Sequence, residues 1–430
     1  MAGQRKILLS WYTDPRYIAP FVLSDMQITV GPKLRPDQPR LMYAARTPLG
    51  VYDLKATLVT QGIATEFDLI VVWADASGVN HPLNLDAFDC PKVLCVGDTH
   101  HLQAPLRKMI SYAADGRFDF VVSSHNRHHL HWFVAAGFGN VAWLPGLKVR
   151  HLPRLFRSSR TAHVCFVGQA GKFHPRRTRL LHALKQDAVP LIATQADREA
   201  AADLYASSVV SFNASLNGDL NLRVFEVLSA GGCLLTDRLA PQAGLDLLLE
   251  EDKEFIAYDS AEELIEKARF LLENPQSALK IASAGNRAFT DSMLPKTRAD
   301  ALLGWVFDDR LNDVFRADRD NRRLESAASI KLETRLSVYE ALQQLHLDKE
   351  TPRVLFASDV PDIYLSDAAD LRRLNPKIAA FGPQDPIGRS EASQPLYDLS
   401  EARAVAWDCV VTPAGRRPPS GLRYAQLLPV

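Results

Sequence analysis

The stretch from Asn217 to Gly232, NGDLNLRVFEVLSAGG, places two charged residues on an otherwise apolar helix. The preceding VVSFNAS is typical of a strand, so a strand, a turn and a helix follow one another, and the helix begins at the carboxyl edge of a sheet. Free backbone N–H groups and the helix dipole favour a phosphate there. Arg223 would add a bidentate donor, and Glu226, one turn further on, could accept hydrogen bonds from two ribose hydroxyls. We therefore predict a nucleotide-binding helix start, with Asn221 among its donor-binding residues.

The same two charges have a structural alternative. Arg223 and Glu226 are three residues apart, which is the spacing of an ion pair on an exposed helix face. The valine, phenylalanine and leucine residues around them leave almost no polar face for such a pair. The sequence alone leaves both interpretations open.

A second candidate phosphate contact is the loop GQAGK, which follows the strand-like HVCFV and precedes a helix. Gly168 and Gly171 would let the backbone approach a ligand closely. Lys172, Arg176 and Arg177 put positive charge nearby, as a departing diphosphate requires. The alternative is that PRRTR only opens a basic amphipathic helix. The spacings of a Walker loop and of a dinucleotide fingerprint are both absent.

Polar residues also follow the strand-like PKVLCVG. In open parallel sheets the carboxyl ends of the strands face the binding crevice. Asp98 or His100 could there take a proton from an acceptor hydroxyl, and we expect His101 on the same acceptor side. Asp75, after LIVVWA, has an equivalent place. An ordinary helix N-cap is the alternative for Asp98 and the threonine after it.

Four histidines follow the next strand, at His125, His128, His129 and His131. The first and third are four residues apart and could share a helix face. No carboxylate or cysteine is close to them in sequence, and the H-E-x-x-H pattern is absent. We therefore expect no metal site and interpret these histidines as solvated or cleft-lining.

The elements that must position these residues form two series. Continuous apolar runs, typical of strands covered on both faces, alternate with helical patterns that end near glycine. This alternation predicts parallel, doubly wound sheets. It is interrupted by the basic RHLPRLFRSSR, which we interpret as an interdomain linker. Two such domains imply a cleft between them.

The end of the chain is less regular. RADALLGWVFDDRLNDVF is typical of a helix that could cross back to the first domain, and the mixed-charge DDRLNDVFRADRDNRRLES indicates a solvated helix. The last eighty or so positions contain three strand candidates, RVLFAS, KIAAFG and DCVVT. They predict a small α/β appendage to which the sequence assigns no role.

Composition excludes several classes of protein. The 430 residues carry 50 Lys+Arg and 50 Asp+Glu, so neither a nucleic-acid wrapper nor a protein steered to anionic membranes is expected. No apolar run approaches the ~20 residues of a membrane span, and no signal peptide is recognised. Five cysteines without metal-type spacing are typical of buried free thiols. We expect a cytoplasmic protein.

Several of these segments together resemble a known family. NGDLNLRVFEVLSAGGCLLTDR, EFIAYDSAEELIEKARFLLENP and VCFVGQAGKFHPRRTRLL are similar to the donor domain of GT-B glycosyltransferases, and most of all to the CgeB-type branch related to spore maturation proteins. PKVLCVGDTHH and FDFVVSSHNRHHLHWFVAAGFGNVAWLPG resemble parts of its first domain. The resemblance covers about two-thirds of the chain, from Lys6 to Phe289.

The resemblance implies specific roles. Glu226 matches the second carboxylate of the E-x7-E motif of retaining GT-B enzymes, which binds the ribose of the donor. The first carboxylate would stand at position 218, where this chain has Gly218, and the nearest acid is Asp219. This departure leaves the contact to the donor sugar, and with it retention or inversion, open. No Asp-x-Asp clamp stands beside the end of an expected strand, which agrees with the metal-independent mechanism of GT-B enzymes.

We therefore expect an α/β protein of GT-B type, with two Rossmann-like doubly wound domains facing a cleft and a C-terminal appendage. The expected bounds are 1–155 for the acceptor domain, 156–310 for the nucleotide-sugar domain, 311–350 for a helical segment and 351–430 for the appendage. The expected function is metal-independent transfer of a sugar from a nucleotide-diphosphate donor to a hydroxyl acceptor, without a cofactor. The alternatives are a nucleotide-sugar epimerase and a catalytically silent glycan- or protein-binding relative.

Overall fold

The computed structural model describes most of the chain, in two compact units. The described residues are 5–35, 45–157, 159–171, 174–317, 330–349, 352–357, 360–371, 375–379, 396–397 and 399–430. The first unit comprises residues 1–319 and the second residues 320–430. The two units are described separately.

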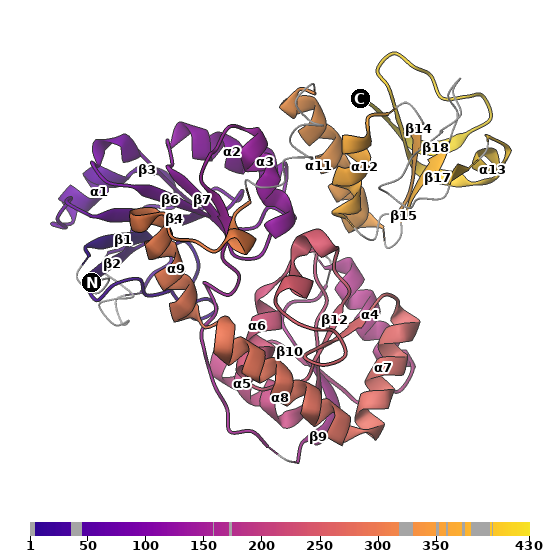
Figure 1. Ribbon diagram of the computed structural model, residues 1–430, viewed down its shortest axis with the longest axis horizontal. Coiled ribbons are helices and arrows are strands. Elements are labelled where there is room, and N and C mark those ends of the chain that lie inside the picture. The colour runs from indigo at the N-terminus through magenta and orange to yellow at the C-terminus, as the bar shows by residue number, and fades with distance from the viewer. Residues whose placement is uncertain are drawn as a thin grey trace. The chain divides into compact units, whose positions relative to one another are not determined.

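The first unit begins with a six-stranded parallel sheet in the order β2-β1-β4-β6-β7-β8 (Figure 1). Its strands are β1 (Ile7–Ser10), β2 (Gln27–Val30), β4 (Leu69–Ala74), β6 (Lys92–Val96), β7 (Phe120–Ser123) and β8 (Val141–Trp143). Its helices are α1 (Leu54–Thr60), α2 (Pro105–Asp115) and α3 (Leu130–Ala135), and β3 (Gly50–Asp53) pairs with β5 (Asn80–Leu83) in a small parallel ribbon. All six residues of β4 are buried, as expected for a strand covered on both faces.

A second parallel sheet follows in the order β10-β9-β11-β12-β13. Its strands are β9 (Thr161–Val167), β10 (Leu191–Thr194), β11 (Ser208–Phe212), β12 (Leu234–Asp237) and β13 (Ile256–Tyr258). Its helices are α4 (Pro175–Gln186), α5 (Arg198–Ser207), α6 (Leu222–Ser229), α7 (Ala261–Glu273) and α8 (Pro275–Ser292). The expected architecture of two Rossmann-like domains is confirmed.

Helix α9 (Pro295–Asp308) returns to the first sheet, as expected (Figure 1). Leu302, Leu303 and Trp305 belong to the apolar core of the first domain, and the Trp305 ring meets that of Phe120 edge-on at 4.9 Å between centroids. The chain therefore crosses between the domains twice, once before β9 and once before α9.

The solvated helix expected over DDRLNDVFRADRDNRRLES is wrong for its described part. Helix α9 ends at Asp308 because Asp309 adopts a left-handed conformation, with φ of 51°, and Arg310 N–H donates back to Gly304 O at 3.0 Å. This is a helix C-terminal motif. Only the short 3-10 turn Asp313–Phe315 follows, and positions 318–329 lie outside the described residues.

The second unit contains a third parallel sheet, in the order β16-β15-β14-β17-β18. Its elements are α11 (Leu332–Asp348), β14 (Arg353–Ala357), α12 (Asp362–Ala369), β15 (Asn375–Ala379), β16 (Leu396–Tyr397), α13 (Leu399–Ala404), β17 (Ala406–Thr412) and β18 (Arg423–Pro429). A buried ion pair joins Arg335 on α11 to Asp367 on α12 at 2.6 Å. The appendage is thus α/β, as expected.

Two further expectations concern the whole chain. All five cysteines are free thiols, and all but Cys90 are buried. Within the described ranges, no helix combines the length and the apolar character needed to cross a bilayer.

Candidate active site between the two domains

A cavity of about 520 Å³ is lined by side chains from both domains of the first unit. The first domain contributes the end of β4 and the loops after β1, β6, β7 and β8. The second contributes the loops after β9 and β11 and the starts of α4 and α6. The cavity therefore lies where open parallel sheets bind their ligands.

Arg223, in the first turn of α6, is held by the ends of β9 and β11 and not by its own helix. Its Nε donates to Val167 O at 2.7 Å and its Nη1 donates to Asn213 Oδ1 at 2.8 Å. Its guanidinium also lies over the ring of Phe166, 4.5 Å from the centroid. Among the described contacts there is no ion pair between Arg223 and Glu226, so the structural alternative for these charges is wrong.

Glu226 lies one turn further along α6 and forms part of the cavity wall. Burial raises the pKa of its carboxyl group, and the charges of Arg223 and Arg198 offset this only in part. At the N-cap position, Asn221 also lines the cavity, and its Oδ1 is buried without a hydrogen-bond partner. The first two turns of α6 and its N-cap therefore offer the cavity a carboxylate, an amide oxygen and the helix N-terminus.

The glycine loop after β9 is braced by Arg177. Its Nη1 donates to Gln169 O at 2.8 Å and its Nη2 donates to Ala214 O at 3.0 Å. Burial, reinforced by the charge of Arg223, lowers the pKa of Arg177 to about 9. Arg177 is buried and lines the cavity, so a merely solvated basic helix does not describe it.

Not all of the donor-binding residues predicted for the glycine loop and α4 lie in the cavity wall. Arg176 points to Asp237 on β12, with 3.5 Å between Nη1 and Oδ2, and is not part of the cavity wall. Gly168 and Gly171 both adopt positive φ, at 148° and 113°. Lys172 lies outside the described residues.

On the first domain, Asp98 and His125 form a hydrogen bond of 3.0 Å between Oδ1 and Nε2. On the other side of the ring, Lys148 Nζ lies 3.3 Å from His125 Nδ1. Burial, together with the charge of Lys148, lowers the pKa of His125 to about 4, which keeps the ring neutral at pH 7. Burial lowers the pKa of Lys148 to about 8. Burial would raise the pKa of Asp98, but the His125 hydrogen bond and the neighbouring histidines outweigh it, so the pKa lies well below its usual range.

His100 forms one of the contacts between the two domains. Its Nε2 lies 3.7 Å from Asp219 Oδ2, and its carbonyl oxygen accepts a hydrogen bond of 2.9 Å from Asn217 Nδ2. Asp219 is itself fixed, because its Oδ1 accepts from Leu216 N at 2.7 Å. Asp219 stands one position after Gly218, where the E-x7-E motif would have its first carboxylate. Its side chain is thus buried in the cavity wall.

The remaining first-domain candidates differ. His101 lines the cavity, with Nε2 3.7 Å from Asp98 Oδ2. Asp75 is buried but is not part of the wall, and its Oδ1 accepts from the N–H of Ser77 at 2.9 Å within its own turn. Lys148, Tyr12 and Trp73 line the cavity and were not predicted. Lys148 could have been predicted from the sequence, because it is a charged residue inside the apolar run WLPGLKV.

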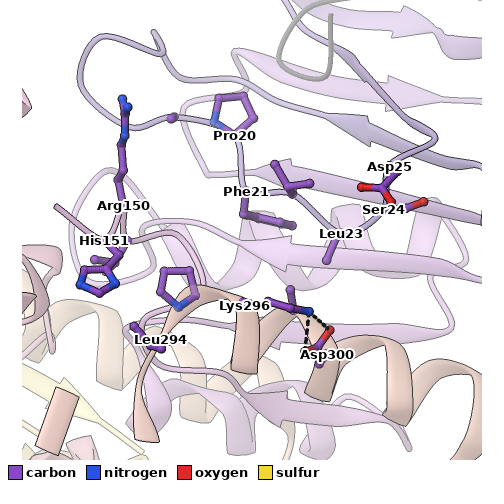
Figure 2. A pocket seen from close by; sticks show the side chains of 15 residues that line it. Pro20, Phe21, Leu23, Ser24, Asp25, Arg150, His151, Leu294, Lys296 and Asp300 are labelled. Carbon is purple, nitrogen blue, oxygen red and sulfur yellow. Dashed lines mark hydrogen bonds and ion pairs between the residues drawn. The ribbon is translucent and has the colours of Figure 1, made fainter. Parts of the chain in front are cut away.

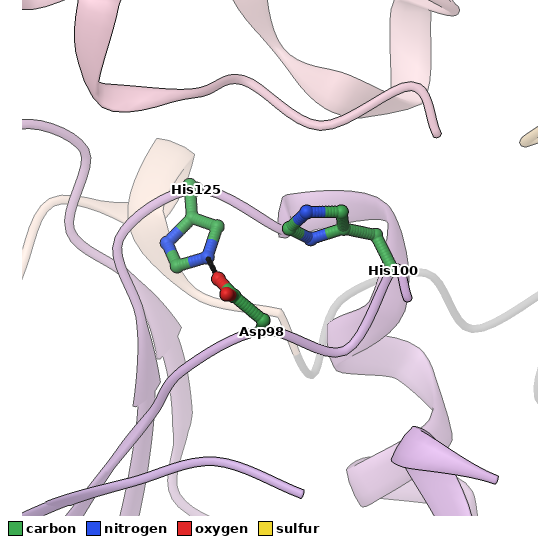
Figure 3. Close-up of side chains that lie close together, drawn as sticks. All are labelled: Asp98, His100 and His125. Atoms are coloured by element: carbon green, nitrogen blue, oxygen red, sulfur yellow. Dashed lines mark hydrogen bonds and ion pairs between the residues drawn. The ribbon is translucent and has the colours of Figure 1, made fainter. Parts of the chain in front are cut away.

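The histidine run is less solvated than expected. His125 lines the cavity, but His128, His129 and His131 are buried away from its wall. Asp98, His100 and His125 offer ligand atoms within 4.8 Å of one another (Figure 3). Such a set could surround a cation. However, His125 Nε2 already donates to Asp98, and Lys148 occupies the other ring nitrogen where a metal-bound histidine would donate its N–H.

A second cavity, of about 660 Å³, lies where the chain crosses between the domains (Figure 2). Phe21, Leu23 and Leu294 line it, and the charged Lys296 and Asp300 on its wall pair with each other at 3.0 Å. Its walls are mainly apolar side chains, and it holds no cluster of groups suited to acid–base chemistry.

Comparison with known proteins agrees with this picture of the second domain. A protein-family model described as Glycosyl transferase-like matches residues 176–304, from the start of α4 into α9. This part of the chain is therefore glycosyl transferase-like. No curated protein matches the sequence at a significant level.

Among solved structures, HepE of Anabaena in complex with UDP and glucose is 13% identical over 70% of this chain and 98% of its own, with a TM-score of 0.49. Sucrose-phosphate synthase of Thermosynechococcus elongatus is 13% identical over 71% of this chain and 99% of its own, with a TM-score of 0.47. TarM is 8% identical, with a TM-score of 0.40, and the chain covers 54% of its length.

Proposed function

We propose that the chain is a glycosyltransferase that moves a sugar from a nucleotide-diphosphate donor to a hydroxyl acceptor in the cavity between its two Rossmann-like domains, without a metal ion or other cofactor. The observation that carries the proposal is the wall formed by α6 and the glycine loop. There Arg223, Arg177 and the helix N-terminus face the same cavity as Glu226. The family match over residues 176–304 supports the same reaction class.

The positive charge on the second-domain wall suits a diphosphate donor. A diphosphate leaving group gains negative charge as its bond to the sugar breaks, and buried cations and helix N-termini stabilise such charge most where water is excluded. Arg223 and Arg177 are held in place by carbonyl oxygens, so little reorganisation is needed when the charge develops. Glu226 would accept hydrogen bonds from the ribose hydroxyls, which stabilise its buried charge.

The acceptor side is the first domain. Asp98 and His100 stand at the carboxyl end of β6, opposite the nucleotide wall. Asp98 or His100 would take the proton of the attacking hydroxyl, and His101 would contact the acceptor.

The first test is binding of UDP, GDP, dTDP, CMP and ADP, measured by thermal shift and calorimetry on the wild type and on Glu226→Gln. At about 100 times the dissociation constant, one nucleotide should stabilise the wild type by ~2.7 kcal/mol. We expect Glu226→Gln to bind that nucleotide at least ~10-fold more weakly, because the amide is a poorer acceptor than a carboxylate. Glu273→Gln, a change at the end of α7, is the control.

Two outcomes would contradict the proposal. If no nucleotide stabilises a folded wild-type protein, the cavity is not a donor site and a silent binding relative becomes the better interpretation. If a sugar nucleotide is isomerised without any acceptor, the activity is that of an epimerase.

A further inference from the structure

We propose that Lys148 and His125 are positioning residues for Asp98, and that these three residues form a hydrogen-bonded chain which holds the Asp98 carboxylate ready to accept the proton of the attacking hydroxyl. The inference rests on the proposed glycosyl transfer and assigns the proton acceptor and its supports within that site.

The hydrogen-bonding capacities of the three groups allow one arrangement. An ammonium group has only donors, and a carboxylate has only acceptors. Lys148 Nζ therefore donates to His125 Nδ1 across 3.3 Å, and His125 Nε2–H donates to Asp98 Oδ1 across 3.0 Å. The neutral imidazole supplies the acceptor and the donor that this order needs, and the Ser124 hydroxyl, with Oγ 3.2 Å from Nδ1, is a second donor to the same nitrogen.

Exposure to solvent increases from Lys148 to Asp98 along these hydrogen bonds. Lys148 and His125 are each only 5% exposed, whereas the Asp98 side chain is 33% exposed. The ammonium also lies 3.9 Å from the centroid of the Trp73 ring, a cation–π contact that fixes it further. The two supports are thus enclosed, and the carboxylate is the member that a substrate can reach.

Asp98 Oδ2 is the oxygen that would accept the proton of the attacking hydroxyl. Oδ1 accepts from His125, while Oδ2 lies 3.7 Å from His101 Nε2 in the cavity wall. In the transfer step the acceptor oxygen bonds to the anomeric carbon, the bond from that carbon to the diphosphate oxygen breaks with its electron pair, and the hydroxyl proton passes to Asp98. A single displacement assisted in this way inverts the anomeric configuration.

The groups that face Asp98 set its response to pH. His100 and His101 belong to its own loop, His125 comes from the loop after β7, and Tyr12 lies on the loop after β1. Lys148 acts through His125. Removing the His125 donor leaves burial as the dominant effect on the carboxyl group, and burial raises its pKa.

The test is the pH profile of kcat/KM for hydrolysis of UDP-glucose, GDP-mannose and dTDP-glucose, with water as the acceptor, in His125→Phe, which removes the donor to Asp98, and in Lys148→Met. We expect the acid limb to move up by ~1–3 pH units in both variants. Asp98→Asn should lose ~100-fold or more at every pH. Lys148→Arg retains a donor and should restore the acid limb. The exposed His182→Gln and Lys185→Met on α4 are matched controls and should leave the profile unchanged.

Three results would overturn the inference. The first is an equal loss of rate at every pH in His125→Phe and Lys148→Met, which is what a merely structural role would give. The second is loss of activity in EDTA with recovery on adding Mn²⁺, which would make Asp98, His100 and His125 metal ligands. The third is retention of the anomeric configuration in the product.

A measurement without turnover separates this inference from the proposed function. Isotope-labelled histidine NMR, with His125→Gln for assignment, reports which ring nitrogen carries the proton. We expect His125 to be neutral, with the proton on Nε2, between about pH 6 and 8. A proton on Nδ1 would contradict the chain even if the protein transfers sugars. Failure of every nucleotide to bind, with the expected tautomer present, would contradict only the proposed function.

Discussion

Arg223 passes beneath the backbone of Gly168, and this contact leaves no room for a side chain at that position. A Cβ built on Gly168 would lie 2.2 Å from Arg223 Nη2 and 3.6 Å from the Phe166 ring. The glycine also adopts φ of +148°, which side chains rarely tolerate. The glycine loop and the arginine, which the sequence predicts as two separate phosphate contacts, are therefore one packed unit.

We predict that Gly168→Ala loses nucleotide affinity at least ~10-fold, because it must displace the arginine, and loses about 1–3 kcal/mol of stability through backbone strain. Calorimetric titration and chemical unfolding measure the two effects. Gly137→Ala is the matched control, since Gly137 also has positive φ but would place its Cβ in open space. Equal affinity in the two variants would show that Arg223 is not fixed by this contact.

The sequence singled out Arg223 and Glu226, which both line the cavity, because two charges on an apolar helix need an explanation. It gave weaker signals for Asp219 and Lys148, whose environments depend on contacts across long separations. Lys148 meets His125 from another loop, and Asp219 meets His100 from the other domain. Arg176 and Asp75 were predicted from local position alone, and tertiary packing turns both away from the cavity wall.

At the scale of the elements, the strands with continuous apolar runs were the predictable ones, because parallel strands are buried on both faces. The strand β2, at the sheet edge, and β3 and β5, in the small ribbon, were missed. β3 has only one buried residue, Tyr52, so its sequence carries no apolar run. The end of α9 was missed because its capping motif depends on the backbone of Asp309, not on glycine.

Helix α9 gives the prediction at this scale. Trp305 is 2% exposed and belongs to the core of the first domain, although α9 directly follows the helices of the second. We expect Trp305→Ala to destabilise the protein by about 3–5 kcal/mol, the usual loss for a buried tryptophan. Unfolding in urea measures it, with Phe270→Ala, at a site 54% exposed, as the control. A loss no larger than in the control would mean that α9 does not brace the first sheet.

At the scale of the whole molecule, the cavity and the second unit are separate in sequence. The cavity wall comes from residues between Tyr12 and Glu226, all within the unit of residues 1–319. The second unit has its own parallel sheet and its own buried Arg335–Asp367 pair. A compact unit with its own core is expected to fold by itself.

The chain shortened to residues 1–319 should therefore bind the same nucleotide as the full chain, with a dissociation constant within about threefold, or less than ~1 kcal/mol. The fragment 320–430 should bind none. Calorimetric titration of both fragments and the full chain measures this directly. A loss of affinity beyond about tenfold in a folded 1–319 fragment, or ~1.4 kcal/mol, would mean that the second unit contributes to the donor site. Unchanged donor binding with reduced transfer would instead assign the second unit to the acceptor, which is the one partner of the reaction that the cavity wall does not identify.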